Sequence, residues 1–66
     1  MYKISKTQFE QIVSNPRLAV AERNMTVGKN HAQLHVLNKQ GDIIAAKIIN
    51  SKGVEKETFL SANQLH

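Results

Sequence analysis

Apolar and polar positions in the first fourteen residues follow the pattern of a capped amphipathic helix. Ser5 and Gln8 have the three-residue spacing of a capping box, in which each side chain bonds the backbone N–H of the other residue. The apolar residues around this cap have the spacing of a hydrophobic staple and of one helix face: Ile4, Phe9, Ile12 and Val13. We predict a helix from about Lys6 to Ser14.

The next segment, NPRLAVAERNMTV at residues 15–27, contains two competing patterns. Asn15 followed by Pro16 is typical of a helix start, and the alanines also favour a helix. A strand-like alternation runs through the same residues, with Leu18, Val20 and Glu22 set against Ala19, Ala21 and Arg23. We predict a second helix here and keep a fourth strand as the alternative.

The stretch HAQLHVL, residues 31–37, has an apolar residue at every second position: Ala32, Leu34 and Val36. A two-residue period predicts a half-buried strand. His31 and His35 are then expected together on the opposite face of that strand, toward solvent.

The rest of the chain predicts a small antiparallel sheet. NKQGD (38–42) is typical of a hairpin loop, and IIAAKII (43–49) and VEKETFL (54–60) predict two further strands joined by the turn NSKG. We therefore predict a single α+β domain over residues 1–66. Its N-terminal helix, or two helices, would pack on a three- to four-stranded antiparallel sheet.

The strand IIAAKII is apolar on both of its faces, so both faces need cover. A chain this short buries only about 60% of its extended surface, and such chains are commonly supplemented by a second subunit. We expect the N-terminal helix to cover one face and a partner, either a second copy or a protein target, to cover the other. The alternative is that a second helix formed by residues 15–24 covers that face. The predicted interface residues are Ile43, Ala45 and Ile49.

Positive charge is concentrated in the middle of the chain. The net charge is +4, and no acidic residue occurs between Glu22 and Asp42. A basic stretch of this kind is suited to contact with phosphate groups. The predicted nucleic-acid-binding residues are Arg23, Lys29, His31, Gln33, His35 and Lys39.

Such residues suggest a way of binding DNA, because a two-stranded ribbon fits the major groove. The base edges would be met by Lys29, His31, Gln33 and His35, and the phosphates would be held by Arg23 and Lys39.

The order of elements and the chain length are similar in outline to those of Cro-like phage repressors, in which small N-terminal helices precede a hairpin such as IIAAKIINSKGVEKETFL. The resemblance would make VGKNHAQLHVL the recognition helix, with Lys29, Asn30 and Gln33 as the reading residues. That segment has the period of a strand and contains Gly28, so we keep the hairpin interpretation and assign no family.

The sequence lacks the residues that other classes of function require. The chain has no cysteine, His31 and His35 have no acidic neighbours to complete a metal site, and Glu55 and Glu57 alternate with Lys56 as on a solvated edge strand. We expect no enzyme activity, no cofactor and no metal. The start MYKISKTQFE lacks the apolar core of a signal peptide, and no stretch is long enough to span a bilayer, which predicts a cytoplasmic protein.

The sequence therefore predicts a small, basic, non-enzymatic binding protein. A nucleic-acid-binding regulator that acts as a dimer is the first interpretation. The alternative is a protein–protein interaction module, such as a small phage- or plasmid-type inhibitor that docks a target through an apolar sheet face.

Overall fold

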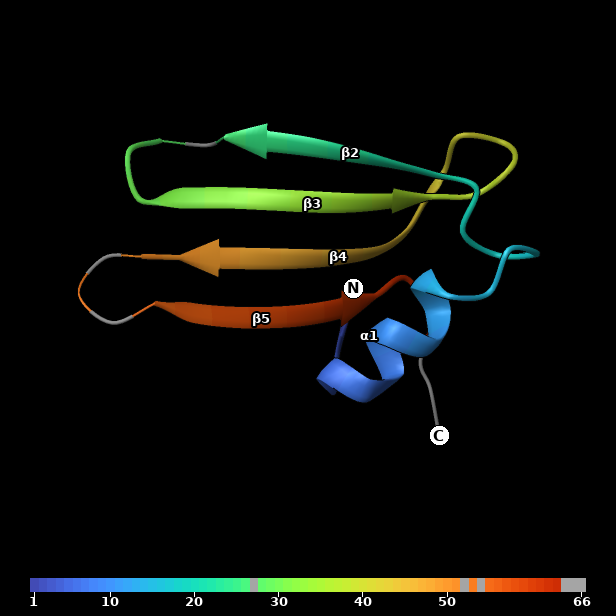
Figure 1. Ribbon diagram of the computed structural model, residues 1–66, viewed down its shortest axis with the longest axis horizontal. Helices are drawn as coiled ribbons and strands as arrows, with labels where there is room; N and C mark the ends of the chain where they lie inside the picture. Colours follow the sequence, from blue (N-terminus) through green and yellow to red (C-terminus); the bar gives the residue numbers. More distant parts are fainter. Residues whose placement is uncertain (27, 52, 54, 64–66) are drawn as a thin grey trace.

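The computed structural model describes residues 1–26, 28–51, 53 and 55–63. The elements in chain order are β1 (Tyr2–Ile4), α1 (Lys6–Val13), β2 (Ala21–Thr26), β3 (His31–Leu37), β4 (Ile43–Asn50) and β5 (Lys56–Ser61). All neighbouring strands are antiparallel, and they form one sheet in the order β1-β5-β4-β3-β2. Figure 1 shows α1 near one end of this sheet, on the side of β5.

The predicted α+β fold, with one or two helices on a three- to four-stranded sheet, is wrong. In the described residues the sheet has five strands, and the single helix is eight residues long. Two strands account for the difference. β1 has only three residues, too few to display an alternating period, and β2 occupies the segment for which we predicted a second helix.

The predicted N-terminal helix is confirmed. Ser5 Oγ accepts a hydrogen bond from the backbone N–H of Gln8 at 3.1 Å, and Gln8 Oε1 accepts one from the backbone N–H of Ser5 at 2.9 Å. The capping box therefore forms as its spacing predicts. At the other end the backbone N–H of Ser14 donates to the carbonyl of Glu10 at 2.9 Å, and the helix stops there.

The helix-start pattern at Asn15 produces one turn only. Asn15 Oδ1 accepts from the backbone N–H of Arg17, and the Asn15 carbonyl accepts from Leu18 and Ala19. The backbone N–H of Val20 then donates to the carbonyl of Leu37 at 2.9 Å, and all six residues of β2 pair with β3. Pairing with β3 thus outweighs the local helix preference of the alanines. Val27, the end of the predicted segment, lies outside the described residues.

The core lies between α1 and one face of the sheet. Phe9 and Ile12 of α1 pack with Val36 of β3 and Ala45 of β4, and Val36 and Ala45 are both 0% exposed. The Phe9 and Phe59 rings add a tilted contact with centroids 5.1 Å apart, within the range of favourable aromatic pairs.

A β-bulge shapes the part of β4 that meets α1. Val36 pairs with Ala45, but the next residue, Leu37, pairs with Ile43, so Ile44 is an extra residue on β4. Ile44 also packs against the core. The simple alternation that we assumed for IIAAKII therefore fails at its first two residues.

The sheet has one short edge and one longer edge. The β1 edge is three residues long and the β2 edge is six. β5, which we expected to be an edge strand, pairs with β4 on one side and with β1 on the other.

Truncation of Val36 should measure how much the core contributes to the stability of the fold. Val36→Ala removes two methyl groups from a fully buried site, and we expect the free energy of unfolding to fall by about 2 kcal/mol. Val20→Ala is the matched control, because Val20 is 58% exposed and its truncation should cost less than about 0.5 kcal/mol. Urea denaturation followed by circular dichroism measures both, and equal losses would contradict this placement of the core.

Candidate nucleic-acid interface

The strand register divides the side chains of the sheet between two faces. Ala45 pairs with Val36 and Ser61 and lies on the face that packs against α1, here called the helix face. The alternate residues lie on the opposite face, here called the distal face. The distal face consists of Lys3 from β1, Ala21, Arg23 and Met25 from β2, His31, Gln33, His35 and Leu37 from β3, Ala46, Ile48 and Asn50 from β4, and Lys56, Thr58 and Leu60 from β5.

Charge is segregated between these faces. The charged side chains of the distal face are Lys3, Arg23 and Lys56, and all three are exposed. The five acidic residues of the chain lie elsewhere: Glu22 and Glu57 on the helix face, Glu10 in α1, and Asp42 and Glu55 outside the strands. The distal face therefore presents positive charge without a compensating carboxylate.

The helix face, in contrast, mixes both signs of charge. Lys47 Nζ lies 3.7 Å from Glu57 Oε2 in an ion pair between β4 and β5. Glu22 of β2 adds a second carboxylate to the same face, in register with Val36. The positive charge of Lys47 is thus offset locally, whereas that of the distal lysines and arginine is not.

The distal cations lie at the margins of a largely uncharged surface. One cross-strand row runs from Arg23 through His35, Ala46 and Leu60 to Lys3. Because neighbouring strands are about 4.8 Å apart, this row is about 19 Å long. Two parallel rows lie beside it, one from Met25 through Gln33 and Ile48 to Thr58, and one from His31 through Asn50 to Lys56.

The two histidines are part of this surface but are not fully solvated. His35 Nε2 lies 3.0 Å from Gln33 Oε1 on the same strand. His35 Nδ1 and His31 Nε2 are buried, and neither has a hydrogen-bond partner among the residues that the structure describes. The strand prediction for residues 31–37 is confirmed. The register places both histidines on the face opposite to that of Val36, as expected, but both side chains are half-buried.

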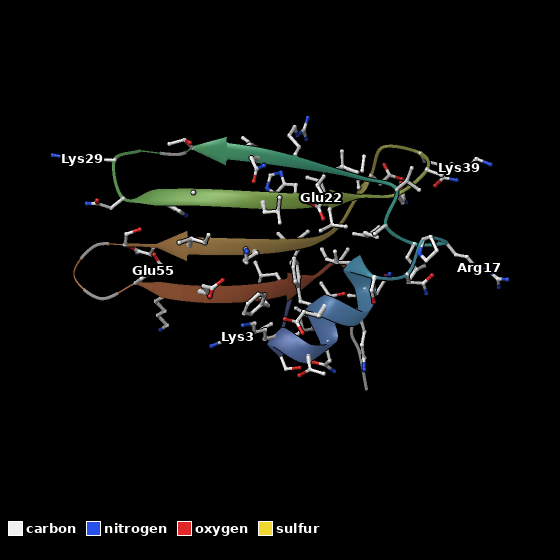
Figure 2. The ribbon with its side chains drawn as sticks, in the orientation of Figure 1. Lys3, Arg17, Glu22, Lys29, Lys39 and Glu55 are labelled. Atoms are coloured by element: carbon white, nitrogen blue, oxygen red, sulfur yellow. The ribbon has the colours of Figure 1, made fainter. Side chains whose placement is uncertain are left out.

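The other predicted binding residues do not join this face. Figure 2 shows Lys29 at the β2–β3 turn and Lys39 in the β3–β4 loop, at opposite ends of the sheet. The Asn38 side chain holds the second loop by accepting from the backbone N–H groups of Gln40 and Asp42. The sheet thus brings together Arg23 and the three β3 residues and leaves both lysines apart.

The three predicted interface residues do not share one surface. Ala45 is buried beneath α1, so the helix covers the face that we expected a partner to cover. Ile49 is half-buried on the same face, in register with Ala32. Ile43 lies beyond the bulge and pairs with Leu37.

Sequence reasoning missed Lys3 and Lys56 as members of the basic surface. Lys3 lies in β1, which was not predicted. Lys56 was noted only as the basic residue between Glu55 and Glu57. The alternation of Glu55, Lys56 and Glu57 along the strand already implied that Lys56 faces away from both carboxylates, and this pattern could have identified it.

In the described ranges no group of three or more His, Cys, Asp or Glu side chains is placed to hold a metal ion. The one helix found there is too short and too polar to cross a bilayer.

Comparisons of this chain with protein-family models, with curated proteins and with solved structures found no match.

The contact between His35 and Gln33 predicts one tautomer. With a proton on Nε2, His35 donates to Gln33 Oε1, and we expect this tautomer of the neutral ring to be favoured. Long-range ¹H–¹⁵N NMR spectra of the imidazole nitrogens identify the protonated atom. Gln33→Leu removes the acceptor and should lower the fraction of the Nε2–H form toward that of a free imidazole side chain, while a dominant Nδ1–H form in the unaltered protein would contradict donation from Nε2 to Gln33 Oε1.

Proposed function

We propose that this chain is a non-enzymatic nucleic-acid-binding protein whose distal face lies against the sugar–phosphate backbone. The observation that carries the proposal is that every charged side chain of that face is basic, while all five carboxylates lie elsewhere. A surface of one sign attracts a polyanion and repels no part of it. The proposal includes action as a homodimer in the cytoplasm, and the absence of cysteine suits that reducing compartment.

The geometry favours backbone contact over base reading. The B-DNA major groove is about 12 Å wide, whereas the row from Arg23 to Lys3 is about 19 Å long. β3 is paired with β4 as well as with β2, so the β2–β3 hairpin is not a free ribbon that could enter the groove. We therefore replace the ribbon idea with a flat face laid across phosphates, which fixes position and carries little sequence information.

Each part of the distal face has a role in this proposal. Lys3, Arg23 and Lys56 neutralise phosphates, and Gln33 and the histidines offer hydrogen-bonding groups between them. Base stacking has no platform there, because Phe9 and Phe59 lie in the core and Tyr2 lies on the helix face, in register with Ser61. A duplex is accordingly the preferred ligand over a single strand.

A second candidate function rests on the uncharged centre of the same face. Ile48 and Leu60, with Ala46 between His35 and Leu60, form an apolar centre bordered by cations. Protein interfaces commonly have an apolar centre and a polar rim. The alternative is thus a docking module for an acidic protein target.

A salt titration tests the first proposal. For binding to a 20-base-pair duplex, log K should fall linearly with the logarithm of the salt concentration. The slope should be about −3 for each bound chain if each chain neutralises three phosphates. The double variant Arg23→Gln, Lys56→Gln should bind more weakly at every salt concentration. Its slope should be smaller by about 2, because each lost phosphate contact removes about one unit.

The matched control removes the same charge from elsewhere. Lys6→Gln, Arg17→Gln alters α1 and the turn after it, and should leave the slope within about 0.5 of the unaltered protein. Equal effects of the two double variants would mean that net charge alone attracts DNA. An absence of duplex binding at 50 mM salt would reject the proposal and leave the acidic protein target.

A further inference from the structure

The edge strand β2 is open along its whole length. All six of its residues are exposed, and its backbone pairs with β3 on one side only. An edge strand of this kind presents a row of N–H and C=O groups that can pair with another strand. The opposite edge, β1, is half as long, so β2 offers the larger pairing surface.

The strand carries two charged residues, Glu22 and Arg23, but lacks the other features that commonly prevent such pairing. Its sequence, AERNMT, contains no proline, glycine or lysine. Its register with β3 is unbroken from Ala21 opposite Leu37 to Thr26 opposite Ala32, so no bulge turns the edge away. This six-residue edge can therefore pair with another strand, provided that the register does not bring like charges together.

We propose that two copies of this chain pair through their β2 strands, antiparallel, about a twofold axis that passes beside Asn24. The two sheets then form one continuous sheet of ten strands. This inference rests on the homodimer part of the proposed function and not on its nucleic-acid part. We propose a second copy as the occupant because β2 can pair with itself in a register that places no like charges opposite each other.

The charged residues of β2 favour one register for the pairing of two β2 strands. A twofold axis perpendicular to the sheet joins each face of one copy to the same face of the other. Two positions of this axis pair five residues of each β2 strand: one passes beside Arg23 and the other beside Asn24. With Arg23 on the axis, two like charges lie directly opposite, which is destabilising. With Asn24 on the axis, Arg23 is opposite Met25 and Glu22 is opposite Thr26, and no like charges oppose each other.

Asn24 suits a position on the axis. Its side chain is exposed, lies on the helix face and carries both a donor and an acceptor, so it can hydrogen-bond to the partner subunit's Asn24. The same register joins the two distal faces. Arg23 and the partner subunit's Arg23 then lie diagonally across the junction, about 7–8 Å apart, where one phosphate group can lie between them.

Charge complementation at Asn24 tests this interface. Sedimentation velocity is measured for the unaltered protein, for Asn24→Lys, for Asn24→Asp and for an equimolar mixture of the two variants. We expect the unaltered protein to dimerise and each variant alone to dimerise at least tenfold more weakly, since like charges then meet on the axis. The mixture should recover the dimer, because Lys meets Asp. Asn30→Lys, in the β2–β3 turn, is the matched control and should dimerise like the unaltered protein.

Several results would overturn the inference: a monomeric unaltered protein at millimolar concentration, an undiminished dimer in both Asn24 variants, or a mixture that stays monomeric. Circular dichroism of each variant shows whether the fold is retained, and the mixture tests the register even if one variant is less stable. A monomer that still binds duplex with the expected salt slope would reject the β2 interface alone. A β2 dimer that binds no duplex would reject only the nucleic-acid proposal.

Discussion

The structure depends on how little of the sheet a single eight-residue helix can cover. Such a helix is about 12 Å long, whereas the longest dimension of the molecule is 36 Å. Phe9 and Ile12 therefore reach only the part of the helix face around Val36 and Ala45. That contact supplies the core, and the strand ladder extends well beyond it. Most of the sheet surface is thus left uncovered by α1.

The separation of charge follows from the pleat and from this one-sided cover. Successive residues of a strand point to opposite faces, so Glu57 and Lys56, although adjacent in sequence, serve different surfaces. The carboxylate lies beside Lys47 on the helix face, and the ammonium group stands on the distal face without a partner carboxylate. A net charge of +4 is modest for the whole chain. The proposed function depends on three of these cations, Lys3, Arg23 and Lys56, which share the distal face.

The distal face and the β2 edge are related features of the same sheet. The face provides positive charge from three of its five strands, and the edge provides an open backbone beside Arg23. Antiparallel pairing at that edge would extend the basic face and leave the α1 core unchanged. The proposals differ in their physical basis, since one depends on charge and the other on backbone hydrogen bonding. Each is therefore tested by a different measurement.

Local patterns in the sequence determined the α1 capping box, the loop at Asn38 and the alternation of β3, because each depends on residues at most a few positions apart. The sequence alone also placed Arg23, Gln33 and the two histidines among the candidate residues. Tertiary structure decided the rest. β1 exists because Tyr2–Ile4 pairs with Phe59–Ser61, more than fifty residues away, and β2 is a strand because β3 pairs with it. The bulge at Ile44 determines which residues of β4 lie under α1. The alternation of residues in β4 does not predict this bulge, because it depends on packing against a helix that is distant in the sequence.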